Sequence, residues 1–168
     1  MVRNVVASLA VGVVALAGCT SSAPDAPSPG ASGASGAPRA VAAGDRVQAL
    51  WADRTAYVGD NSKVIALVED AGFGPVGSYS LSLWTTRPPY AVTITVTDPA
   101  KPLDATDLTG PATLLLGTVT NLDAVHVTGP GREFSLTARQ ATAALGHDVK
   151  MLGADRNALD DYVRSLDD

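Results

Sequence analysis

The most reactive side chain of this 168-residue chain belongs to Cys19, its only cysteine. Cys19 ends an apolar run that closes with Leu16, Ala17 and Gly18. A cysteine sulfur is a nucleophile that a transferase can acylate, and small residues before it let a protease approach the backbone. We therefore expect chemistry at Cys19 to be processing and modification. After acylation no thiol is left for a disulfide or a cysteine-based metal site.

The residues before Cys19 have the layout of a secretory signal. Arg3 supplies a basic start, and the run from Val5 to Ala17 is uncharged and apolar. This run is roughly 13 residues long, fewer than the roughly 20 that a membrane-spanning helix needs. Leu16-Ala17-Gly18-Cys19 resembles the lipobox of bacterial lipoproteins, whose cysteine receives a diacylglycerol and becomes the first residue of the mature chain. The alternative is an ordinary secretory signal that ends at a cysteine by chance.

These observations divide the chain into three segments. We expect a lipoprotein signal peptide at 1–18, a lipidated linker at 19–44 and a single globular domain at 45–168. The linker consists almost entirely of Ala, Ser, Gly and Pro, which cannot bury a core, so we expect it to be disordered. Acyl chains on Cys19 would hold the protein in membrane lipid, on the extracytoplasmic face of the cell membrane.

Composition excludes some partners. The formal net charge is −5, and loss of Arg3 with the signal would make it one unit more negative. Nucleic acids and anionic lipid head groups are bound by clustered Lys and Arg, so neither is expected as a partner of the folded domain. An envelope protein remains as a candidate partner.

Apolar periodicity predicts the elements that must position any site. Alternating apolar residues indicate two strand pairs, at 79–83 with 92–96 and at 125–127 with 134–136. Helical spacing indicates helices near 47–51, 64–71, 112–119, 138–145 and 159–166, with Asp45, Thr137 and Asp155 as caps. We predict an α+β fold: a four-stranded, mainly antiparallel sheet of two hairpins with helices packed on one face.

Several short motifs occur together in an order that is typical of one family. They are Tyr57-Val58-Gly59-Asp60-Asn61-Ser62-Lys63-Val64, Leu83-Trp84-Thr85-Thr86 with Pro89-Tyr90, Asn121 to Val125, and Phe134-Ser135-Leu136-Thr137. Through these motifs the chain resembles the bacterial domain of unknown function 4825. The resemblance covers roughly Trp51 to Leu166. The resemblance implies an extracytoplasmic protein, either a lipoprotein or a domain attached to a membrane regulator. It implies no catalytic residues, because the family has none assigned.

The candidate binding surface is the connection of the first hairpin, which carries Trp84, Arg87 and Tyr90. Aromatic residues held by neighbouring prolines lose little entropy on contact, and Trp, Tyr and Arg are enriched in binding hot spots. The alternative is that Trp84 and Tyr90 only cover the edge of the core.

The other polar residues favour structural roles. His126 lies between two apolar strand residues and should face solvent, and His147 follows a helix end, where a cation is favourable. The two histidines lack zinc-site spacing, and the remaining acidic clusters lack the pattern of a calcium loop. Helix capping and solubility account for those clusters, at Asp104, Asp107, Asp155, Asp160 and Asp161.

One glycine pattern, Gly72 to Gly77, spells G-x-G-x-x-G but follows a predicted helix and precedes a strand. A dinucleotide site needs the reverse order, and Pro75 removes an amide that could bind phosphate. We therefore expect no cofactor and no metal. The predicted function is a non-catalytic, membrane-anchored binding or sensing domain. The alternative is an envelope enzyme whose site uses scattered Asp and His residues.

Overall fold

The computed structural model describes residues 43–98, 103 and 106–167. Four strands form one sheet in the order β1-β2-β3-β4, with β1 at Tyr79–Trp84, β2 at Ala91–Val96, β3 at Ala124–Gly129 and β4 at Arg132–Thr137. The pairs β1–β2 and β3–β4 are antiparallel hairpins, as predicted. The central pair β2–β3 is parallel, so the sheet is mixed. A parallel pair needs a crossover connection, and helix α3 (Thr109–Thr118) lies in it.

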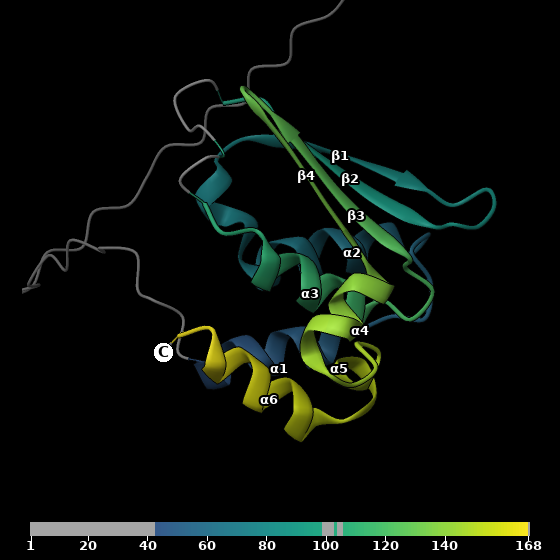
Figure 1. The fold of residues 1–168 in the computed structure, drawn as a ribbon, viewed down its shortest axis with the longest axis vertical. Coiled ribbons are helices and arrows are strands. Elements are labelled where there is room, and N and C mark those ends of the chain that lie inside the picture. The colour runs from purple at the N-terminus through teal and green to yellow at the C-terminus, as the bar shows by residue number, and fades with distance from the viewer. Residues whose placement is uncertain (1–42, 99–102, 104–105, 168) are drawn as a thin grey trace, which may run out of the picture. The chain divides into compact units, whose positions relative to one another are not determined.

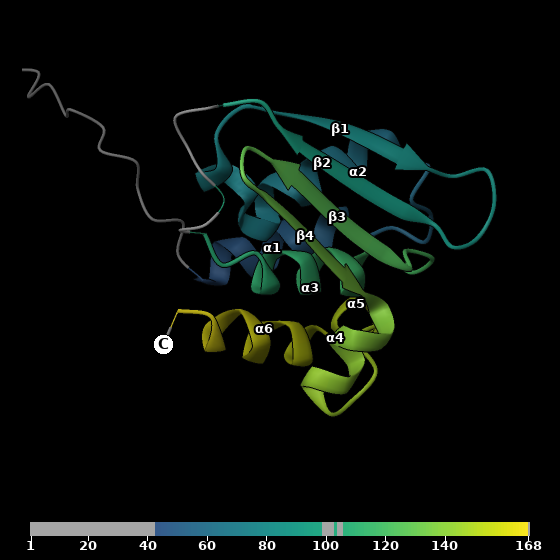
Figure 2. The same cartoon turned by 45° about the horizontal axis from the view of Figure 1, so that its top comes forward.

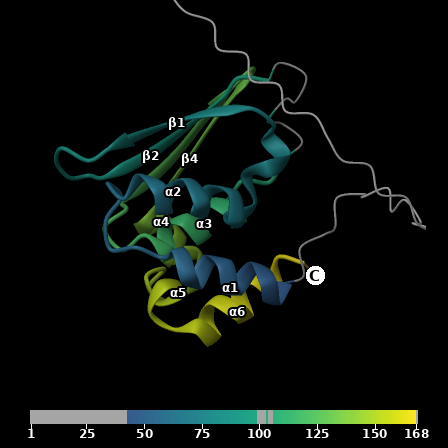
Figure 3. The same cartoon turned by 180° about the vertical axis from the view of Figure 1, so that it is seen from behind.

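The helices lie on one side of this sheet (Figures 1 and 3). Their bounds are α1 Ala43–Asp53, α2 Asn61–Val68, α4 Ala138–Leu145, α5 Met151–Ala154 and α6 Arg156–Ser165. The inner face of the sheet is fully apolar at its centre, where Val92, Ile94, Val125 and Val127 are buried. The predicted fold class is therefore confirmed. We use "open face" for the other side of the sheet, which no described helix covers.

Helix α3 differs from its predicted form. The spacing of its apolar residues predicts one buried stripe, but Ala112, Thr113, Leu114, Leu115 and Leu116 are all buried. The reason is its position: α3 contacts β3 and β4 as well as α1 and α5, and Figure 1 shows it between the sheet and the outer helices. A helix that is covered on all sides must be apolar all round.

The ends of the C-terminal helices follow local capping rules. Thr137 and Gln140 form a reciprocal capping box at the start of α4, and Gly146 ends that helix in the left-handed conformation at φ 76°. Asp155 accepts a hydrogen bond from the amide of Asn157 and caps α6. These predicted caps are confirmed, whereas Asp45 is no cap, because α1 begins two residues earlier at Ala43.

Helix α5 is joined to α3 by a close backbone approach and a lysine. A Cβ on Gly153 would lie 2.5 Å from the Gly117 carbonyl oxygen, so only glycine fits there. Lys150 Nζ donates to the carbonyl oxygens of Leu116 (2.6 Å), Val119 (3.0 Å) and Leu122 (2.7 Å), which lie at and beyond the C-terminus of α3. Burial lowers the pKa of Lys150 to about 8, against the attraction of nearby carboxylates. In the described part of the chain, no helix has the length and apolarity to cross a bilayer.

Candidate binding surface

The connection between β1 and β2 carries the residues that the sequence singles out. It extends beyond the ends of β3 and β4 (Figure 2). Trp84, the last residue of β1, is 50% exposed, and its Nε1 donates a 3.0 Å hydrogen bond to the carbonyl oxygen of Arg87. The bond closes the connection and fixes the edge of the indole ring, while half of the side chain stays in solvent. The Arg87 side chain is exposed.

Tyr90 has a different role from Trp84 and Arg87. Its side chain is half-buried and packs against the core. Its amide donates to Asp123 Oδ2 at 2.7 Å, and its carbonyl accepts from the amides of Asp123 (2.9 Å) and Ala124 (3.2 Å). These bonds attach the end of the hairpin to the start of β3. The structure thus brings Trp84 and Arg87 together and places Tyr90 on the core side. For Tyr90 this agrees with the alternative interpretation, in which the ring covers the edge of the core.

The open face continues from Trp84 across all four strands. The register aligns one row of Ser82, Thr93, His126 and Ser135 and the next row of Ser80, Thr95, Thr128 and Glu133. The hydroxyl groups of Thr128 and Thr95 lie 3.3 Å apart. Most side chains in these rows are short and polar. The face is therefore rich in hydrogen-bonding groups, with an indole ring at one end.

His126 has a partner that its sequence position does not disclose. Its Nδ1 lies 3.0 Å from Ser135 Oγ on the neighbouring strand. A serine and a histidine also meet at this distance in hydrolase triads, where the serine contacts Nε2 and not Nδ1. The carboxylate nearest in sequence, Asp123, bonds the Tyr90 amide through Oδ2. The pair also lies on the open face of the sheet, where Ser135 is exposed and His126 is partly buried.

A hollow lies on the open face beside the hairpin connection. It has a volume of about 680 Å³ and is lined by Pro88, Pro89, Asp123, Ala124, His126, Thr137, Ala138 and Arg139. Most of its surface is apolar, and His126 and Arg139 supply its basic groups. No local sequence pattern predicts this hollow, because its walls come from three segments that only the strand register brings together.

The motifs that carry the family resemblance meet at this end of the molecule. The amide of Val58 donates to Asn121 Oδ1 at 2.7 Å, and the amide of Asn121 donates to the Ala56 carbonyl at 3.2 Å. A Cβ on Gly59 would lie 3.8 Å from the Thr85 side chain. The loop before α2, the loop before β3 and the β1–β2 connection therefore form one contiguous region.

Several of the remaining polar residues have local partners. Asp107 Oδ1 accepts from the Thr109 amide at 2.9 Å, and hydrogen bonds from Thr109 lower the pKa of Asp107. Asp160 pairs with Arg164 at 2.9 Å, and His147 Nδ1 lies 3.2 Å from the Asp148 carbonyl. Within the described ranges, no three His, Cys, Asp or Glu side chains group so as to hold a metal ion. Cys19, the lipobox residues Leu16, Ala17 and Gly18, and Asp104 lie outside the described residues.

The fold and this surface define a small α+β domain whose sheet has one covered face and one open face. A family model described as Domain of unknown function (DUF4825) matches residues 50–137, and the chain belongs to this family. The match runs from α1 to the end of β4, so it confirms the resemblance in the strands. The segment from α4 to α6, to which the resemblance also extends, lies beyond the matched residues. No curated protein and no solved structure matches the chain.

Proposed function

We propose that this chain is a lipoprotein, anchored by Cys19 to the extracytoplasmic face of the cell membrane, and that its domain binds an envelope protein. The lipobox pattern supports the anchor. The binding surface consists of Trp84, Arg87 and the open face beside them. Binding needs no chemistry at the site, and we assign no catalytic residue, cofactor or metal to this function.

The proposal of a binding surface rests on the exposure of Trp84 and on the hydrogen bond that holds its ring. A tryptophan that is 50% exposed forgoes burial of a large apolar surface, and solvent offers no compensation for its ring faces. Its hydrogen bond to Arg87 holds the ring in one orientation, so contact with a partner would cost little additional entropy. Tryptophan and arginine are enriched in binding hot spots, and here both lie beside the hydroxyl-rich sheet face.

The anchor is tested by changing Cys19→Ser in the full chain and fractionating the cells. We expect the variant to leave the membrane fraction, because serine cannot take the thioether-linked lipid. Thr20→Ser, next to the acylated position, is the matched control and should stay in the membrane. Equal membrane retention of Cys19→Ser and the parent would show that the anchor is something else.

The surface is tested by photo-crosslinking in cells from position 82, on the open face, followed by mass spectrometry of the captured protein. We expect Trp84→Ala and Arg87→Ala to reduce the yield of one specific product. Arg164→Ala removes an exposed arginine from α6 and serves as the control. If Arg87→Ala folds and crosslinks like the parent, the hairpin connection is not the binding surface.

One observation favours a second function, the 3.0 Å contact between Ser135 and His126. The alternative is an envelope hydrolase in which Ser135 attacks an acyl group and His126 takes its proton. Binding is favoured over hydrolysis because the pair is open to solvent and has no carboxylate orienting the histidine among the described residues. If the protein hydrolyses an activated ester, and Ser135→Ala abolishes this activity while Trp84→Ala retains it, hydrolysis would be favoured over binding.

A further inference from the structure

A second pocket lies away from the open face, where the loop before α2 meets the end of α3. It has a volume of about 330 Å³ and is lined by Ala52, Arg54, Thr55, Ala56, Lys63, Thr118, Thr120 and Gly153. Its lining is mainly polar and contains two basic residues and no acidic one. In a chain with net charge −5, such a concentration of positive charge at a cavity calls for a physical explanation.

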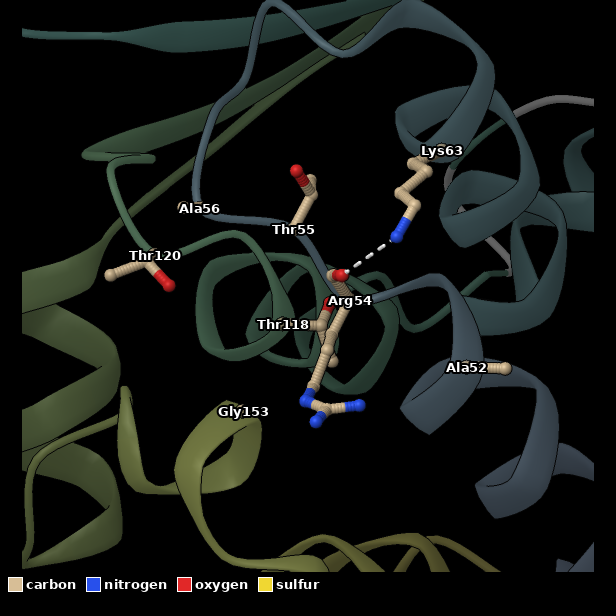
Figure 4. Close-up of a pocket in the computed structure, with 8 residues that line it drawn as sticks. All are labelled: Ala52, Arg54, Thr55, Ala56, Lys63, Thr118, Thr120 and Gly153. Carbon is tan, nitrogen blue, oxygen red and sulfur yellow. Dashed lines mark hydrogen bonds between the residues drawn. The ribbon is translucent and has the colours of Figure 1, made fainter.

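Lys63 is placed where a cation is electrostatically unfavourable. It is the third residue of α2, close to the positive end of the helix dipole. Its Nζ has one hydrogen bond within the described structure, to the Arg54 carbonyl at 3.4 Å (Figure 4). An ammonium group has three donors. Two donors of a half-buried lysine are thus left for a group outside the protein.

Arg54 contributes the second cation. Its guanidinium stacks over the Trp51 ring, 3.8 Å from the ring centroid, and its Nη1 donates to the Trp51 carbonyl oxygen. In Figure 4 its side chain points to the part of the pocket where Gly153 and Ala52 lie, away from Lys63. Stacking fixes the plane of the guanidinium, and most of its five N–H donors remain without a partner in the described structure.

The hydroxyl groups of the pocket differ in availability. Thr118 Oγ1 donates to the Leu114 carbonyl at 2.7 Å, and Thr55 Oγ1 is shared between the Tyr57 amide (3.3 Å) and Asp60 Oδ2 (3.5 Å). The Thr120 hydroxyl has no hydrogen bond to any described residue. The pocket therefore offers donors from Lys63, Arg54 and Thr120, each on a different segment, and the nearest carboxylate that bonds its lining is Asp60, at the Thr55 hydroxyl.

We propose that this pocket binds phosphate, as the free ion or as the phosphate group of a small soluble ester. A phosphate dianion accepts several hydrogen bonds at once, and its charge is attracted by both Lys63 and Arg54, which lie in different parts of the pocket. An anion near Lys63 would also remove the conflict between that lysine and the dipole of α2. The site is separate from the open face, so it would give the domain a small-molecule ligand in addition to its protein partner.

The test is titration of the purified full chain with inorganic phosphate, and separately with glycerol 3-phosphate, at constant ionic strength maintained with chloride. Amide shifts in ¹H–¹⁵N spectra report binding. We expect saturable shifts at 54–56, 63 and 118–120. Lys63→Gln should weaken binding about tenfold or more, as loss of a charge-assisted hydrogen bond predicts. Tighter binding of glycerol 3-phosphate would identify an ester as the ligand, and tighter binding of inorganic phosphate the free ion.

Two controls keep the result interpretable. Lys63→Arg keeps the charge and should bind phosphate within a few-fold of the parent, which a merely structural role for Lys63 does not predict. Arg164→Gln removes the same charge from the exposed surface of α6 and should bind like the parent. Absence of saturable shifts in the parent, or equal affinity in Lys63→Gln and the parent, would overturn the proposal. So would acetate binding as tightly as phosphate.

Discussion

The two faces of one sheet show how differently adjacent residues of the same strands are used. On the inner face, Val92 and Ile94 of β2 pack against the helices and are fully buried. On the open face, Thr93 and Thr95 of the same strand carry hydroxyl groups and meet no helix. Alternation along a strand sends successive side chains to opposite faces, so these two surfaces share a backbone and differ only in side-chain chemistry.

We therefore assign stability of the fold mainly to the inner face and partner recognition to the open face. Burial of apolar side chains provides most of the favourable free energy of folding, so the inner face should tolerate little change. The open face contributes few buried contacts and should tolerate substitution without loss of the fold. Substitutions on the two faces of the same strands therefore test the functional assignment. If a substitution on the open face weakens binding and leaves the fold stable, the loss of binding cannot be attributed to unfolding.

The largest expected effect is on the inner face. Ile94→Ala should lower the free energy of unfolding by on the order of 2–5 kcal/mol, because it removes buried methyl groups and leaves a cavity. Substitution of the next residue on the same strand, Thr95→Ala, should change the free energy of unfolding by less than about 0.5 kcal/mol. Denaturant unfolding of both variants measures the difference. Equal effects would mean that the two faces are not distinct in stability.

The next effect concerns Lys150, a half-buried charge on the helical side. Lys150→Met should destabilise the protein by about 1–3 kcal/mol, because the carbonyl oxygens of Leu116, Val119 and Leu122 would lose their donor. Met keeps much of the apolar stem, so the loss reports mainly on hydrogen bonding. Denaturant unfolding at pH 7 measures it. A variant as stable as the parent would show that the carbonyls find water instead.

The same lysine also predicts a pH-dependent effect. Burial lowers the pKa of Lys150 from 10.5 to about 8 in the folded state. Between these values the unfolded chain binds more protons, so this residue makes stability rise with pH. The neutral amine still donates to two carbonyls, so deprotonation keeps most of the contact. We expect the stability of the parent relative to Lys150→Met to increase between pH 8 and pH 10.5, and a decrease would contradict the lowered pKa.

The smallest effect on stability is expected on the hairpin connection. Arg87→Ala should change the free energy of unfolding by less than about 0.5 kcal/mol, because the Arg87 side chain is exposed and Trp84 bonds only its carbonyl. Tyr90→Ala should cost more, since that ring packs on the core. Thermal or denaturant unfolding of the two variants distinguishes them. If both cost the same, the separation of Tyr90 from the surface is wrong.

Local patterns predicted the hairpins and two helix caps because each depends on neighbouring residues. Alternation defines a strand and its faces, and Thr137 and Asp155 bond amides within three positions. Alternation does not define the direction of one hairpin relative to the next, so the parallel β2–β3 pair was not predicted. The contact of His126 with Ser135 depends on register, and Lys150 bonds carbonyls that lie 28 to 34 positions away. No local pattern contains such contacts.

The central claim is that the domain binds its partner through the open face. The most direct test places one photo-crosslinking residue at a time in the full chain, at Ser82 and Thr95 on the open face and at the exposed Asp161 on α6. The proposal predicts that the same protein is captured from both sheet positions, at a yield several times that from position 161. Capture from position 161 alone, or at equal yield from all three, would contradict it.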